Sequence, residues 1–240
     1  MVPELLEAVA VLIQNILEES RVIKMILLKN FIIPLDNNEI LRQLKSKNSK
    51  ESSRPPPTSL IEEIKELKDY VLPILRPRAI YDIFESKALE PKFIFKKSEK
   101  TVLSICTIGK ELETHVIDIL KRGELAKGAI LNAIASHAAE QTAEYVNQEI
   151  LKNLAEDIKG KEVTCRFSPG YCQWELDKGQ QMIFGQLDGS KIGVNLTSSM
   201  MMNPVKSVSF AINIGKEVDK ELGLRDCENC DMVNCAFRRI

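Results

Sequence analysis

The sequence predicts an α+β fold, from the kinds of segment it contains and from their order. Short apolar runs bounded by Lys, Ser and Gly residues are typical of strands, as at residues 93–95 and 101–108. Between residues 124 and 158, apolar side chains recur every four positions, which is typical of one long helix. The helical and strand-like segments come in mixed rather than alternating order, and this order favours α+β.

The other elements are predicted by the same rules. The chain from Pro3 to Leu44 reads as helical, with a break at residues 33–36 between two segments. A capped amphipathic helix begins at Thr58, and further helices are expected at 111–120 and near 176–187. The remaining strands are predicted at 163–167, 192–196 and 207–214. The last two of these are expected to pair as antiparallel neighbours across a turn at 200–206.

Three regions are expected along the chain. The stretch from residue 45 to residue 57 is polar and charged and ends in three prolines, which is the composition of a linker. An N-terminal helical segment and this linker together form the first region, residues 1–57. An α+β domain is expected at residues 58–225. A Cys-rich tail forms residues 226–240.

Composition excludes some classes of partner. Among 240 residues, 33 are Lys or Arg and 34 are Asp or Glu, so the balanced charge gives no reason to expect nucleic-acid binding. Glu4, Glu7 and Glu18 interrupt the apolar N-terminus, and no stretch reaches the about 20 apolar residues of a membrane span. We therefore expect a cytoplasmic protein without a membrane segment, whose 6 Cys are reduced thiols or metal ligands rather than disulfides.

The segment at residues 165–172 has the composition of a ligand-binding loop. Pro169 fixes φ and Gly170 permits backbone angles that other residues avoid, so the chain can reverse there. Arg166 and Tyr171 would then point at one volume, where a guanidinium suits a carboxylate and a tyrosine offers a flat face and a hydroxyl. The alternative is an ordinary turn with a solvated arginine.

The long helix carries a second candidate, Glu140. It shares a face with small residues that would let a ligand approach the backbone, namely Ala129, Ala133, Ser136 and Ala143. The alternative is that Glu140 faces water on a helix that is rich in alanine for its propensity. His115 and His137 show no partnering pattern, and neither is assigned a role.

The order of these motifs, from the Arg166 loop through residues 192–199 to residues 200–209, resembles one family. It is similar to the activation (reactivation) domain of cobalamin-dependent methionine synthase in its stand-alone form, most clearly over residues 161–212. The resemblance implies a twisted, mainly antiparallel sheet flanked by helices. It also implies an S-adenosylmethionine site made of Arg166, Ser168, Gly170, Tyr171 and Glu140. One acidic position of the family is lost where this chain reads Leu-Thr-Ser-Ser at residues 196–199. The family's aspartate near the start of the domain and tyrosine near its end have no counterpart that can be placed here.

The same resemblance implies a function. The protein would support reductive methylation of cob(II)alamin on a cobalamin-dependent methionine synthase or a related corrinoid methyltransferase, as a methyltransferase component if it is itself an enzyme. The chain lacks an Asp-x-His-x-x-Gly corrinoid motif, so a corrinoid-binding partner protein would present the cobalamin, with a reductase or flavodoxin as a candidate electron donor. No catalytic residue is expected, because the task is positioning. The alternative is a non-catalytic corrinoid-protein binding module or electron conduit.

A candidate metal centre lies in the tail at Cys227, Cys230 and Cys235. Thiolates at this spacing select zinc or an iron-sulfur cluster, and the cluster is favoured because a redox centre suits a protein that meets an oxidised corrinoid. Cys165, Cys172 or an external group would supply a fourth ligand. The alternative is a tail of reduced cysteines.

Overall fold

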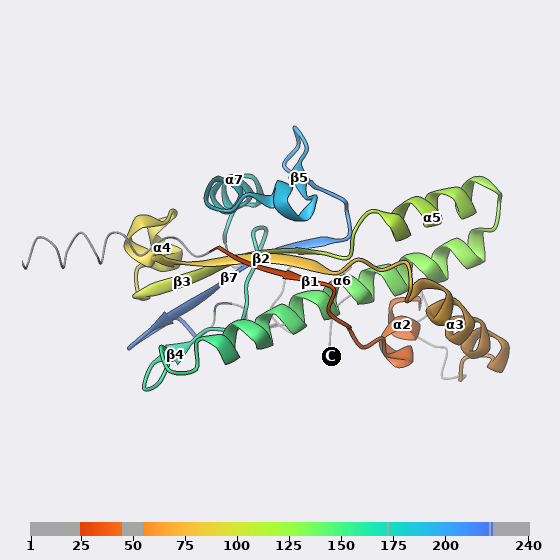
Figure 1. The fold of residues 1–240 in the computed structure, drawn as a ribbon, viewed down its shortest axis with the longest axis horizontal. Helices are drawn as coiled ribbons and strands as arrows, with labels where there is room; N and C mark the ends of the chain where they lie inside the picture. Colours follow the sequence, from red (N-terminus) through yellow and green to blue (C-terminus); the bar gives the residue numbers. More distant parts are fainter. Residues whose placement is uncertain (1–24, 45–54, 172, 221, 223–240) are drawn as a thin grey trace, which may run out of the picture.

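A five-stranded antiparallel sheet forms the centre of the fold (Figure 1). The structure, a computed structural model, describes residues 25–44, 55–171, 173–220 and 222. All neighbouring strands of the sheet are antiparallel. In spatial order the strands are β1 (Ile26–Lys29), β2 (Arg78–Glu85), β3 (Lys100–Thr107), β7 (Ser207–Gly215) and β4 (Glu162–Val163). The α+β fold class predicted from the sequence is confirmed.

Helices pack on both faces of this sheet (Figure 1). The α-helices are α2 (Asn37–Leu44), α3 (Thr58–Val71), α4 (Lys92–Phe95), α5 (Glu111–Lys121), α6 (Leu125–Asn153) and α7 (Leu176–Gln186). Two short 3₁₀ segments, η1 (Ser86–Ala88) and η2 (Gly189–Ile192), and a separate ribbon of β5 (Asn195–Leu196) and β6 (Met202–Asn203) complete the described elements.

Helix α6 covers one face of the sheet with its C-terminal half. Val146 and Ile150 of α6 pack there against Val102 of β3 and against Phe210 and Ile212 of β7. The N-terminal half of α6 packs instead with α2, α3 and α5 in a helical core. The stripe at every fourth position that predicted this helix is buried throughout its length, as Ile130, Ile134, Ala138, Thr142, Val146, Ile150 and Leu154.

The opposite face is covered by α4, α7 and η2. Alternate residues of the strands point to this face, because successive side chains of a strand point to opposite sides of a sheet. Leu103 and Ile105 of β3 belong to this core together with Ile183 of α7. Trp174 is 1% exposed and lies edge-on to Phe95 of α4, with the ring centroids 5.7 Å apart. The segment that precedes α7 is thereby fixed to the sheet.

Four of the predicted helices are confirmed, namely α3, α5, α6 and α7, although α6 ends at Asn153 rather than at residue 158. In the N-terminal segment, α2 is confirmed, but the predicted helix is wrong at Ile26–Lys29. These residues form β1, which pairs with β2 through Ile26 and Tyr81. Residues 1–24 and 45–54 lie outside the described chain, and the division at residue 57 stays a prediction.

Three strand predictions are wrong in part. Residues 93–95 lie in α4, because a run of three apolar residues does not distinguish a strand from one helical turn. Residues 192–196 do not pair with residues 207–214: the short β5 pairs with β6, while β7 pairs with β3 and β4. The strand predicted at 163–167 is reduced to β4 and a single bridge between Phe167 and Ala211.

Candidate functional site

The predicted turn lies where the chain leaves the edge of the sheet. After the bridge at Phe167, the Tyr171 N–H donates to the Ser168 carbonyl at 3.2 Å. The Gly170 N–H donates to the Trp174 carbonyl at 2.7 Å, and Gly170 has φ of 91°. A positive φ of this size is strained for any residue with a Cβ, which explains the glycine at this position. The buried Trp174 anchors the far end of the loop.

Arg166 points from this loop toward α6. Its Nη2 donates to Glu140 Oε1 at 2.5 Å, and its Nε lies 3.6 Å from Glu144 Oε2. The guanidinium carbon lies 5.9 Å from the ring centroid of Phe210 on β7. The side chain is only 14% exposed, so the ion pair is more stable against screening by salt than a surface pair. The structure thus brings together two residues that stood out separately in the sequence and that the family resemblance placed in one site.

Glu140 stands at the point where α6 changes partners. Residues up to Ala139 pack in the helical core, and residues from Ala143 onward pack on the sheet. The small-residue face expected around Glu140 is not a continuous open surface, since Ala133 and Ala143 are buried and Ala129 is exposed. Glu140 itself is partly buried and bound to Arg166, so it is not an isolated solvated side chain.

Beside this ion pair, part of the edge of β7 has no strand partner among the described residues. Strand β4 pairs with β7 only at Ile214 and Gly215, and the bridge to Ala211 is the last contact on that side. From Ser207 to Ser209, no strand among the described residues pairs with this edge. Tyr171, at the tip of the neighbouring loop, is 56% exposed.

Sequence reasoning missed Lys206, which follows the β5–β6 ribbon. Its Nζ donates to Ser136 Oγ on α6 at 2.8 Å. The side chain is partly buried, and burial lowers the pKa of its ammonium. No local pattern singles it out, because its partner Ser136 lies 70 positions away in the sequence.

Comparison with known proteins decides the family. A family model described as "Vitamin B12 dependent methionine synthase, activation domain" matches residues 91–220, which include α6, the Arg166 loop and β7. The chain belongs to this family of activation domains. No curated protein sequence matches it.

A solved structure supports the activation-domain fold. The crystal structure of the MetH reactivation domain bound to AdoHcy aligns with a TM-score of 0.57, over 82% of this chain and 80% of that chain. The aligned residues are 14% identical, so the likeness extends to the fold. The sheet flanked by helices, which the resemblance implied, is therefore confirmed.

The buried thiol Cys106 and the two histidines of this activation domain have contacts that explain their places in the fold. Cys106 is fully buried, and burial raises the pKa of its thiol to about 12, although the nearby Arg166 lowers it in part. This thiol is protonated at neutral pH and is a poor nucleophile. His137 Nε2 accepts a hydrogen bond from the Asp36 backbone N–H at 3.0 Å, and His115 lies against Tyr70.

The expected metal centre falls on residues whose structure is not described. Cys227, Cys230 and Cys235 lie outside the described residues, as does Cys172, while Cys165 is exposed. Within the described residues, no group of three or more His, Cys, Asp or Glu side chains could hold a metal ion.

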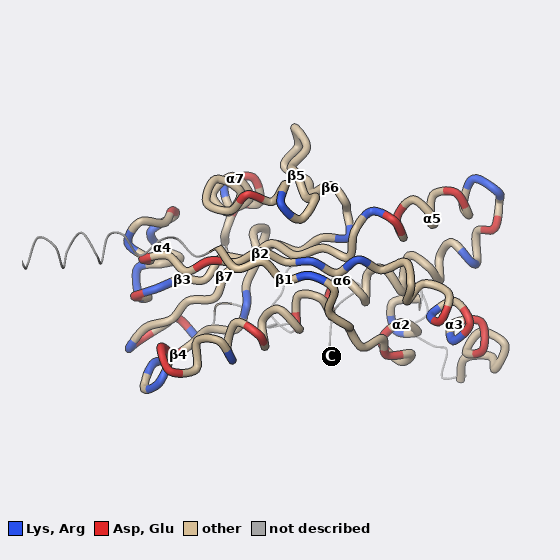
Figure 2. The backbone as a smooth tube through the Cα atoms, in the orientation of Figure 1, with Lys and Arg blue, Asp and Glu red and all other residues tan. Residues whose placement is uncertain are grey.

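None of the described helices is both long and apolar enough to cross a lipid bilayer. Charged residues of both signs are spread along the described chain (Figure 2).

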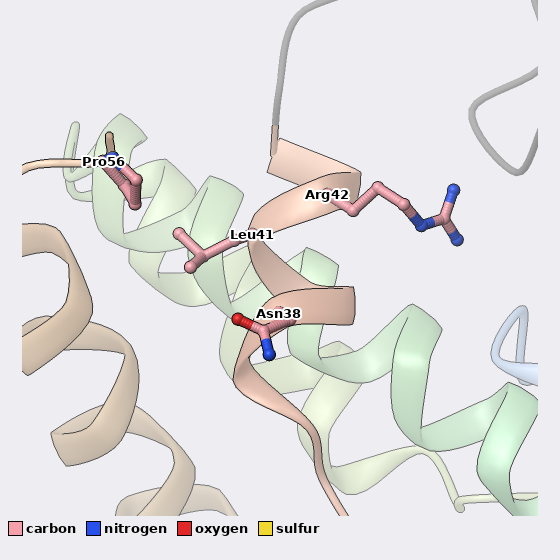
Figure 3. Close-up of a pocket in the computed structure, with 4 residues that line it drawn as sticks. All are labelled: Asn38, Leu41, Arg42 and Pro56. Atoms are coloured by element: carbon pink, nitrogen blue, oxygen red, sulfur yellow. The ribbon is translucent and has the colours of Figure 1, made fainter. Parts of the chain in front are cut away.

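A small depression of about 180 Å³ lies on α2 and is lined by Asn38, Leu41, Arg42 and Pro56. Leu41 points toward Pro56, whereas the Arg42 side chain extends away from the other three (Figure 3). None of the candidate ligand residues lines it, and its lining offers little charge to a ligand because Arg42 is paired with Glu39. The Arg166 loop remains the better-supported site of the activation domain.

Proposed function

We propose that the protein binds S-adenosylmethionine beside Arg166, Ser168, Gly170, Tyr171 and Glu140, and that it serves to reactivate cobalamin on a separate corrinoid methyltransferase. The observation that carries the proposal is the partly buried Arg166–Glu140 ion pair, beside a part of the β7 edge that has no strand partner among the described residues. Family membership supports the reactivation role. The AdoHcy bound to the MetH reactivation domain supports a ligand of this chemical type.

The charges of the site fit such a ligand. S-adenosylmethionine carries a sulfonium, an ammonium and a carboxylate. Glu140 and Glu144 offer negative charge to the two cationic groups, and Arg166 holds both carboxylates in place. The exposed Tyr171 ring offers a flat face to the adenine, and the part of the β7 edge without a strand partner among the described residues offers backbone donors and acceptors.

The residues of the site position the ligand rather than react with it. The partner's cobalamin supplies the cobalt that accepts the methyl group. A methyl transfer of this kind requires the sulfonium to be held in line with its acceptor, and positioning of this kind can lower the barrier substantially. No nucleophile and base are needed, and the thiol near the site, Cys106, is buried and protonated at neutral pH.

Calorimetric titration with S-adenosylmethionine tests the site. Arg166→Met and Glu140→Gln should each weaken binding by about tenfold or more. Glu140→Gln removes a charge-assisted contact to the ligand, and Arg166→Met removes the guanidinium that holds Glu140 and Glu144 in place. Lys178→Met is the matched control, since this lysine is 69% exposed on α7 and should not affect binding. Absence of binding by the wild type at millimolar ligand, or equal binding by wild type and Arg166→Met, would overturn the proposal.

The reactivation role has a separate assay. The protein is mixed with a corrinoid methyltransferase in the cob(II)alamin state, a reductase or flavodoxin as electron donor, and S-adenosylmethionine. The methylcobalamin absorption spectrum should appear only when the protein and the methyl donor are both present. Formation of that spectrum at the same rate with Arg166→Met would favour the alternative role of a binding module or electron conduit.

A further inference from the structure

Phe210 of β7 places an aromatic ring under the Arg166 guanidinium. The guanidinium carbon lies 5.9 Å from the ring centroid, which is within the distance at which a cation is attracted to an aromatic face. Phe210 is fully buried and the Arg166 side chain is 14% exposed, so little water competes with this contact. The Arg166 charge also acts on the buried Cys106 thiol of β3, which agrees with a guanidinium held above the sheet.

The bridge at the edge of the sheet explains why these two side chains meet. Phe167 forms an antiparallel bridge with Ala211, and both residues belong to the core on the α7 face. Arg166 directly precedes Phe167 and lies on the opposite face, where it meets Glu140 of α6. Phe210 directly precedes Ala211 and lies on that same face, in the core that packs against α6. The residues beside the bridge thus bring a cation and an aromatic ring together.

The ring is the contact of Arg166 whose place the sheet fixes. Phe210 stands opposite Ser104 of β3, within the part of β7 that is paired with β3. Glu140 and Glu144 reach Arg166 from α6 through side chains that are 26% and 43% exposed. Glutamate side chains lose rotamer freedom when they are held in one geometry, whereas the ring of Phe210 is already held by the core. The ring therefore limits the orientations of the guanidinium from the side of the sheet.

We infer that Phe210 is a positioning residue of the candidate site, which holds the Arg166 guanidinium in the orientation that binding of S-adenosylmethionine requires. The inference rests on the proposed function, and it adds a residue that touches Arg166 rather than the ligand. With the ring in place, the guanidinium stays between the sheet and α6, where it holds Glu140 and Glu144. Without the ring, Arg166 gains other orientations, and binding must first order it, which weakens the affinity.

Calorimetric titration of the full chain with S-adenosylmethionine tests the inference. Phe210→Leu should weaken binding by about threefold to tenfold, because it removes the ring but keeps an apolar side chain in the core. Phe210→Met should have the same effect, which keeps the test informative if Phe210→Leu folds poorly. Phe210→Tyr keeps the ring face and should bind within about twofold of wild type. Val102→Ala is the matched control, because it removes volume from the same core on β3 and should not affect binding.

Two further measurements separate positioning from a general loss of stability. In the Arg166→Met protein, Phe210→Leu should cause no additional loss of affinity, because the ring acts through the guanidinium. In a proton–nitrogen correlation spectrum of the ligand-free protein, the Arg166 Nε–H resonance should shift in Phe210→Leu, since an aromatic ring shifts the resonances of groups above its face. Phe210→Tyr should leave that resonance close to its wild-type position.

Each outcome separates this inference from the proposed function. If the wild type does not bind S-adenosylmethionine, the proposed function fails and the inference fails with it. If the wild type binds but Phe210→Leu and Phe210→Met bind equally well, the inference is overturned and the proposed function stands. The same conclusion follows if Val102→Ala loses as much affinity, or if Phe210→Leu causes the same loss in the Arg166→Met protein. A loss that requires Arg166 and is absent in Phe210→Tyr supports both.

Discussion

His137 is a buried histidine that acts as a hydrogen-bond acceptor. It is 3% exposed on α6 and accepts from the backbone N–H of Asp36, which fixes the segment before α2 to the long helix. Burial lowers the pKa of its imidazole, although nearby Glu39 and Asp36 raise it in part. The neutral ring is thus the form that the fold stabilises, because a protonated Nε2 could not accept this bond.

The fold should therefore lose stability as the pH falls. The unfolded chain has a histidine pKa of about 6.5, so below that pH the unfolded state takes up a proton that the folded state does not. The free energy of unfolding should decrease from about pH 7 downward and level off below the lowered folded pKa. Urea denaturation between about pH 7.5 and pH 5 should give a flatter curve for His137→Gln than for wild type. Parallel curves for wild type and His137→Gln would contradict the prediction.

At the same scale, the turn at Gly170 could be predicted from the sequence, whereas the contacts of the candidate residues could not. Arg166 and Gly170 were found because the chemistry of a turn is local, and the positive φ of Gly170 agrees with it. The Arg166–Glu140 pair joins residues 26 positions apart, and only the packing of α6 on the sheet brings them together. Lys206 was missed for the same reason, since its partner Ser136 lies 70 positions away.

Among the elements, four helices (α3, α5, α6 and α7) and the two long strands β3 and β7 were predicted, whereas the other strands were missed or misplaced. Helix α6 was predicted because its apolar residues recur at every fourth position over a long stretch. Strand β2 was missed because residues on both its faces are buried, which removes the alternation of apolar and polar residues. Strand β1 has only four residues, and pairing with β2 rather than local propensity determines its conformation. The separate β5–β6 ribbon could not be distinguished from a hairpin with β7, because strand partners are not encoded locally.

The pairing of β1 with β2 places two like charges opposite each other. Lys29 and Arg78 are directly opposed in the antiparallel register, and neither has an acidic partner among the described residues. Such like-charged pairs destabilise a sheet, and opposite charges contribute about 0.2–1 kcal/mol. Lys29→Glu should therefore raise the free energy of unfolding by about 0.5–1 kcal/mol in low salt, as measured by urea denaturation.

Salt and a neutral variant control this measurement. The gain from Lys29→Glu should shrink in high salt, because exposed charges are screened. Lys29→Gln should give an intermediate gain, since it removes the repulsion without adding an attraction. A Lys29→Glu protein less stable than wild type in low salt would show that the two side chains do not interact.

At the scale of the whole molecule, α6 joins two cores and places the candidate site between them. Its first half packs among helices and its second half packs on the sheet, with Glu140 at the transition. The site is thus built from a long helix, the last full strand and a loop anchored by Trp174, three parts that each have their own buried support. A ligand that bound there would meet elements that are already held in place, which lowers the entropic cost of binding.

This arrangement predicts an uneven distribution of stability, which hydrogen exchange read by mass spectrometry would measure. Strand β3 is paired along all eight of its residues with both β2 and β7, so its amides should exchange slowest. The four-residue β1 at the sheet edge and the short β5–β6 ribbon should exchange much faster, because few hydrogen bonds must break to expose them. S-adenosylmethionine should then slow exchange in peptides that cover Arg166 to Tyr171 and in those around Glu140, without changing β1. Protection of β1 equal to that of β3 would contradict the first expectation. Protection by the ligand spread evenly over the chain would mean that the ligand stabilises the fold as a whole and not the loop from Arg166 to Tyr171.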